Sequence, residues 1–139
     1  MEDSQEETQE QAFIRAFIEP RAQERFLGFV ANPKRRVKFL SMLYNPHSLS
    51  GLSRVSNTED FPEPVERLLR QKGAGGTCYV FSPDPALDRR EMPLGEALAV
   101  LMTRGGAGVV SCIPGRLAYL KAEHDGYILE RKDLHRTRS

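Results

Sequence analysis

The chain has 139 residues, of which 40% are hydrophobic and 28% are charged, as expected for one globular domain with a core of its own. Twenty basic and nineteen acidic residues leave a net charge of +1, which lacks the strongly basic footprint of a dedicated nucleic-acid-binding protein. No apolar run is long enough to span a membrane, and the acidic N-terminus is unlike a signal peptide. We therefore expect a cytoplasmic protein whose two cysteines are free thiols.

The N-terminal third of the chain is predicted to be helical. Residues 1–11 are acidic and are expected to form a frayed end, and residues 12–45 carry apolar side chains at helical spacing. Pro20 and Pro33 stand where helices begin, so this part forms three short helices or one kinked pair. The residues expected to face inward are Ala12, Phe13, Phe17 and Ile18, then Ala22, Phe26 and Val30, then Val37, Leu40, Leu43 and Tyr44.

The rest of the chain is predicted to contain a loop and then both helices and strands. Residues 45–62 are rich in Ser, Asn and Pro and are predicted to form a long loop, with one helical turn near 49–55. Residues 63–133 are then predicted to have the order α-β-α-β-β-β. The expected helices are 64–72 and 94–103, and the expected strands are 77–82, 107–113, 117–123 and 127–132.

Two turns connect the last three strands. Pro114-Gly115 has the composition of a type II turn, and Asp125-Gly126 is a strong hairpin signal. A two-residue turn at Asp125-Gly126 places Lys121 opposite Glu130, with opposite charges on the outer face of a sheet that is apolar on its other face.

The predicted fold class is α+β, with N-terminal helices packed on a small mixed sheet and the element order α-α-α-α-β-α-β-β-β. The first two strands are joined by a helix, so they are expected to be parallel with a right-handed crossover. The whole chain is interpreted as a single domain, residues 1–139.

This topology defines one candidate site at the carboxyl ends of the two parallel strands, where ligands bind in open α/β sheets. Cys112 lies there in the stretch S-C-I-P-G-R, and Arg116 is a cation that could lower the pKa of its thiol. The fourth strand returns His135 to the same edge. The candidate catalytic residues of a cysteine enzyme are therefore Cys112, His135 and Arg116, and the candidate ligand-binding residues are Asp84, Asp88, Arg89 and Arg116.

The simpler interpretation of S-C-I-P-G-R is a hairpin turn with an unreactive thiol, which is the commoner role of a free cysteine. Arginine would stand six residues after the cysteine in the tyrosine-phosphatase pattern, but position 118 is Ala. Both glycine-rich stretches run from helix into strand, the reverse of a phosphate-binding loop. No metal-ligand spacing occurs, so neither metal nor cofactor is predicted.

The densest basic cluster is P-K-R-R-V-K, residues 33–38. On a helix, Lys34, Arg35 and Lys38 share one side and are candidate partner-binding residues, although a solvated helix face is the more frequent outcome. Three functions follow. The favoured one is a non-catalytic protein-binding or regulatory domain, whose partner is another protein or a second copy. A small-ligand or cysteine-dependent enzyme site at Asp84, Cys112 and Arg116 is the alternative, and nucleic-acid binding through helix 33–38 is a further alternative.

Overall fold

The computed structural model describes residues 3–43, 49, 52–54, 61–104, 106–122 and 126–131. Its helices are α1 (Asp3–Phe17), α2 (Pro20–Ala31), α3 (Arg36–Met42), α4 (Pro62–Gln71) and α5 (Leu94–Arg104). Its strands are β1 (Leu52–Arg54), β2 (Thr77–Phe81), β3 (Arg90–Pro93), β4 (Gly108–Ile113), β5 (Leu117–Lys121) and β6 (Gly126–Glu130). The predicted α+β class and the predicted order of elements are confirmed, with β1 and β3 as additions.

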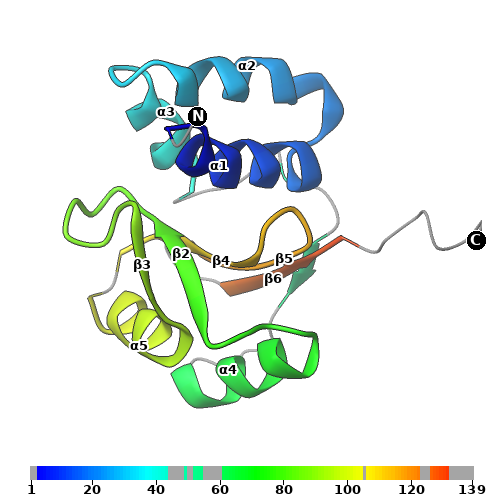
Figure 1. Ribbon diagram of the computed structural model, residues 1–139, viewed down its shortest axis with the longest axis vertical. Coiled ribbons are helices and arrows are strands. Elements are labelled where there is room, and N and C mark those ends of the chain that lie inside the picture. Colours follow the sequence, from blue (N-terminus) through cyan, green and yellow to red (C-terminus); the bar gives the residue numbers. More distant parts are fainter. Residues whose placement is uncertain are drawn as a thin grey trace, which may run out of the picture.

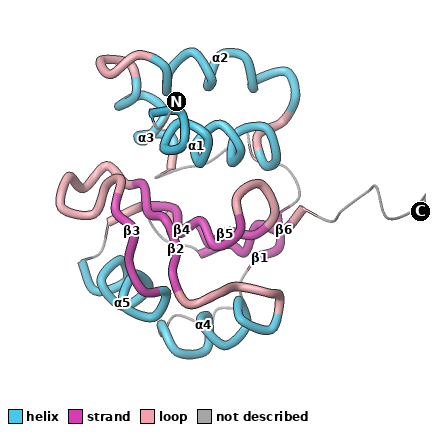
Figure 2. The backbone as a smooth tube through the Cα atoms, in the orientation of Figure 1, coloured by secondary structure: helices cyan, strands magenta, loops and turns pink. Residues whose placement is uncertain are grey.

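The described part of the chain forms three layers, with one sheet in the middle (Figure 1). The six described strands have the order β1-β6-β5-β4-β2-β3. Helices α1, α2 and α3 cover one face of this sheet, and α4 and α5 cover the other (Figure 2). The prediction of a sheet with one apolar face is therefore wrong, because helices bury both faces.

Every pairing between the described strands is antiparallel, so the predicted parallel pair and the mixed sheet are wrong. β2 pairs with β4 in the antiparallel direction, with Phe81 opposite Val109. The cause is β3, which turns back beside β2 before the chain enters α5. The helix thus connects β3 to β4, which run in the same direction on either side of β2. The sequence of β3, R-E-M-P, contains proline and two charges and lacks the composition of a strand.

Two local predictions at the other edge of the sheet are also wrong. The helical turn predicted near 49–55 is replaced by β1, which pairs with β6, and by a bridge between Leu49 and Ile18. In the β5–β6 pair, Lys121 lies opposite Gly126 instead of Glu130. This shift of four positions is even, and it keeps each side chain on its predicted face.

The turn at Pro114-Gly115 is confirmed. Gly115 has a φ of +74°, and the Arg116 amide donates to the Ile113 carbonyl at 2.9 Å. A type II turn needs a positive φ at its third residue, which glycine adopts without strain. The stretch S-C-I-P-G-R therefore forms the tight connection between β4 and β5.

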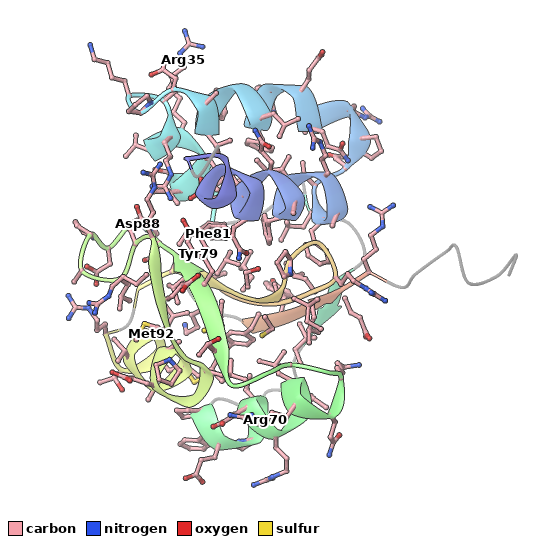
Figure 3. The ribbon with its side chains drawn as sticks, in the orientation of Figure 1. Arg35, Arg70, Tyr79, Phe81, Asp88 and Met92 are labelled. Atoms are coloured by element: carbon pink, nitrogen blue, oxygen red, sulfur yellow. The ribbon has the colours of Figure 1, made fainter. Side chains whose placement is uncertain are left out.

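The core between the first helical layer and the sheet is built from aromatic rings. Phe39 is fully buried, its ring centroid lies 5.8 Å from that of Phe81 in a stacked arrangement, and it meets Phe13 edge-on at 6.3 Å. Tyr79 and Phe81 point from β2 toward α1 in Figure 3. Val37, which the sequence predicted to face inward, is 59% exposed, because α3 presents Arg36, Phe39 and Leu40 to the interior.

We predict that Phe39→Ala lowers the free energy of unfolding by about 3–5 kcal/mol, because it removes a buried ring and leaves a cavity between α3 and β2. Val37→Ala on the same helix is the matched control and should change stability by less than about 0.5 kcal/mol. Urea unfolding of both variants measures the difference, and equal losses would contradict this assignment of the inner face.

Candidate functional site

The candidate site predicted around Cys112 is divided between the two ends of β4. Asp84 follows the end of β2, where the Ser82 hydroxyl donates to the Ala107 carbonyl at 2.7 Å, just before β4 begins. Cys112 stands near the other end of that strand, about 20 Å away at the usual strand rise. The antiparallel pairing of β2 and β4 causes this separation. Cys112 and Arg116 lie close in sequence at the hairpin, but Asp84 does not join them.

Both thiols lie on the face of the sheet that α4 and α5 cover. Burial raises the pKa of Cys78 and of Cys112 from the ordinary 9.0 to about 12. Arg70 lowers the pKa of Cys112, but desolvation and the neighbouring Cys78 outweigh it. The depressed thiol pKa that a cysteine nucleophile needs is therefore absent from the two described thiols. His135, the predicted imidazole partner, lies outside the described residues.

The predicted ligand-binding residues Asp84, Asp88 and Arg89 all belong to the loop between β2 and β3, and this loop is held by internal hydrogen bonds. Asp84 accepts from the Arg104 guanidinium and from the Ala86 amide, the latter at 3.0 Å, and these hydrogen bonds lower the pKa of its carboxyl. Asp88 accepts from the Ser82 amide at 3.1 Å. Arg89 has a φ of +62°, a strained conformation for a side chain other than glycine.

The loop is joined to the helical layer by one buried guanidinium, that of Arg36 on α3. Its Nε donates to Oε1 of Glu10 on α1 at 3.0 Å, and its Nη2 donates to Oδ1 of Asp88 at 2.9 Å. The second oxygen of Glu10 accepts from Nη2, and the second oxygen of Asp88 accepts from Nη1. Each carboxylate is therefore bound in a bidentate manner. Figure 3 shows Asp88 on the side of its loop that faces α3. We call Glu10, Arg36 and Asp88 the ionic clamp.

The ionic clamp balances the cost of burying its charges. Arg36 is 7% exposed and Glu10 is 3% exposed. Desolvation alone lowers the pKa of Arg36, but the hydrogen bonds from its guanidinium to Asp88 and Glu10 outweigh that effect and raise its pKa above the ordinary value. Arg89 adds a second positive charge, with its Nε 3.9 Å from Glu10. This cluster ties three segments together and has no open ligand position among its described contacts.

The helix predicted from Pro33 begins only at Arg36, so Lys34 and Arg35 lie in the turn before α3 and Lys38 lies on α3. All three are exposed. Figure 3 shows Arg35 on the outer side of the helical layer, away from the sheet. Val37, on the same segment of the chain, is exposed as well. Within the part of the chain that the structure describes, no carboxylate is within 4.0 Å of these three cations. We call Lys34, Arg35, Val37 and Lys38 the α3 basic face.

The described residues contain no group of three or more His, Cys, Asp or Glu side chains that could hold a metal ion. None of the helices in the described ranges combines the length and apolar character needed to cross a bilayer. Comparison with known proteins finds no matching family model, no matching curated protein and no matching solved structure.

The sequence held a signal for the ionic clamp that periodicity alone could reveal. Arg36 heads the series 36, 39, 40 and 43, and Glu10 heads the series 10, 13, 14 and 17, each at helical spacing with buried apolar side chains. Two opposite charges that continue apolar helix faces indicate a buried ion pair. The prediction placed the apolar face of α3 one residue away, on Val37, and so assigned Arg36 no role.

We predict that Arg36→Met costs about 3–5 kcal/mol of stability, because it removes the guanidinium that donates to the buried Glu10 carboxylate and to Asp88. Arg35→Met is the matched control, one residue along on the exposed side, and should change stability by less than about 0.5 kcal/mol. Adding Glu10→Gln to Arg36→Met should recover part of the loss. Urea unfolding of the three variants measures this, and no recovery in the double variant would argue against the ion pair.

We predict that alkylation of Cys112 by iodoacetamide stays slow and keeps accelerating with pH toward about 12, because burial favours the protonated thiol. The rate is measured on Cys78→Ser, in which the hydroxyl can still donate to the Met92 carbonyl as the thiol does. The same variant unfolded in urea is the control and should level off near the ordinary pKa. A plateau below pH 8 in the folded protein would contradict the assignment and restore the enzyme alternative.

Proposed function

We propose that this chain is a non-catalytic binding domain that docks an acidic surface of another protein on the α3 basic face. The observation that carries the proposal is that Val37 is exposed on the same segment as Lys34, Arg35 and Lys38, with no described carboxylate to neutralise these cations. A protein interface combines apolar and charged side chains in this way. It offers an acidic partner both a desolvated contact and charge complementarity.

The ionic clamp supports this proposal because it fixes the orientation of the surface. Arg36 is held on the inner side of α3 by Glu10 and Asp88, so the neighbouring residues 35 and 37 point outward. A preorganised helix loses less conformational entropy on binding than a mobile one. The cations are therefore presented on a rigid support.

The surface favours a protein over a nucleic acid. The chain has a net charge of +1, and the α3 basic face has three cations beside an exposed valine, whereas nucleic-acid affinity depends on many phosphate contacts. The free edge of β3 is a poor alternative for docking, since proline and exposed charges protect it against strand pairing. The two free thiols also support a reducing, cytoplasmic setting.

We predict that a random peptide library displayed on phage, selected on the full chain, yields acidic peptides that contain apolar residues. Lys34→Glu combined with Lys38→Glu should weaken their binding at least about 100-fold, and Val37→Ser by about 10-fold, in a fluorescence titration. The charge-matched control is Arg67→Glu with Arg70→Glu on α4, on the opposite side of the molecule, which should leave affinity unchanged (Figure 3).

The proposal fails if the selected peptides bind the Lys34 and Lys38 variant as well as they bind the natural chain. Duplex DNA is titrated in parallel over a range of salt concentrations. Tighter binding of DNA, with a steep salt dependence and no effect of Val37→Ser, would replace the proposed protein partner by a nucleic acid.

A further inference from the structure

We propose that Cys78 and Cys112 are an oxidation site, at which a hydroperoxide converts the two thiols into a cross-strand disulfide between β2 and β4. This inference rests on the pairing of the two strands and is independent of the proposed function. It assigns a chemical role to two cysteines that the α3 basic face does not use.

The register of β2 and β4 places the two cysteines opposite each other. The last paired residues of the two strands are Tyr79 and Ser111. Continued by one residue in the antiparallel direction, the same register sets Cys78 against Cys112. Residues directly opposite on antiparallel strands have Cα atoms about 4.5–5.5 Å apart, which lies within the range that a disulfide spans.

Both side chains lie on the same face of the sheet. Cys78 belongs to the core beneath α4 and α5, and Cys112 packs against that core. β4 has an irregular register between Ser111 and Ile113 against β5, and this bulge lets Cys112 and Ile113 both pack on this face. The Cys78 thiol also contributes to the raised pKa of Cys112, as expected for close neighbours.

Burial sets the order of the reaction. Cys78 is 6% exposed, whereas Cys112 is only partly buried and stands next to the exposed turn at Pro114. The hydroperoxide therefore meets Cys112 first. Its thiolate sulfur attacks one peroxide oxygen, an S–O bond forms, the O–O bond breaks, and the leaving oxygen takes a proton to become water or an alcohol.

The second step uses Cys78 as the resolving thiol. Its sulfur attacks the sulfur of the Cys112 sulfenic acid, the S–O bond breaks, and water leaves with the proton of the Cys78 thiol. The two thiols have together lost two electrons and two protons, and the hydroperoxide has been reduced. The raised pKa of both thiols makes this reaction slow, so it requires a sustained supply of oxidant.

The disulfide would close the segment that contains β3, α5 and the loop that carries Asp88. Such a cross-link removes conformational freedom from the unfolded chain, so the oxidised protein should unfold at a higher temperature. It would also fix the ends of the segment to which the ionic clamp is attached. Oxidation would therefore stiffen the support of α3 without altering the α3 basic face itself.

The test treats the full chain with hydrogen peroxide, blocks the remaining thiols with iodoacetamide, and digests with trypsin without reduction. We expect mass spectrometry to find the peptides 73–89 and 105–116 joined, and dithiothreitol to separate them. The intact protein should be monomeric, lighter by two hydrogen atoms before blocking, and should melt several degrees higher than the reduced form. Cys78→Ser and Cys112→Ser should each abolish the joined peptides.

Three results would overturn the proposal. The first is that both peptides stay separate and both thiols remain alkylatable after unfolding in urea. The second is a disulfide that forms only between two chains. The third is sulfinic acid at Cys112 with Cys78 still a free thiol, which would show that the pair does not meet. Peptide mapping of the natural chain decides among these results even if a serine variant does not fold.

Discussion

The arrangement of this molecule depends on one buried guanidinium. Arg36 joins α1, α3 and the loop between β2 and β3, because its guanidinium donates four hydrogen bonds to two carboxylates from distant parts of the chain. Without Glu10 and Asp88, a buried arginine would cost more free energy than the surrounding apolar contacts supply. Its position decides which side of α3 faces the aromatic core and which side carries the exposed cations.

The short strand β3 has a comparable influence on the sheet. By turning back beside β2 it makes the β2–β4 pairing antiparallel, and the β2–β3 loop then lies at the opposite end of β4 from Cys112. The same reversal moves Asp88 beneath α3, where it completes the ionic clamp, and sets Cys78 across from Cys112. This reversal separates the residues of the predicted cysteine enzyme. It also brings Asp88 to Arg36 and Cys78 to Cys112, although these residues are far apart in the sequence.

The sequence was sufficient for those parts of the fold that follow from local patterns. Apolar spacing predicted the helices, Pro20 predicted the start of α2, and Pro114-Gly115 predicted a turn that the φ of Gly115 confirms. The helix start predicted at Pro33 is wrong, since α3 begins at Arg36. The candidate site was harder, because it depends on which strands pair and in which direction. β3 has no strand-like composition, and the salt-bridge partners of Arg36 lie 26 and 52 positions away. Helical spacing could mark Arg36 and Glu10 as inward-facing charges, but it does not tell which distant carboxylates meet the guanidinium.

The central claim is that the ionic clamp holds the helical layer on the β2–β3 loop. Amide hydrogen exchange of Asp88→Asn tests it most directly, since this change removes one charge and keeps an oxygen that can accept from the Ser82 amide. We expect faster exchange in α3 and in residues 82–88, with the amides of β4 and β5 as protected as in the natural chain. Unchanged exchange in α3, or an equal acceleration throughout the described residues, would contradict the account.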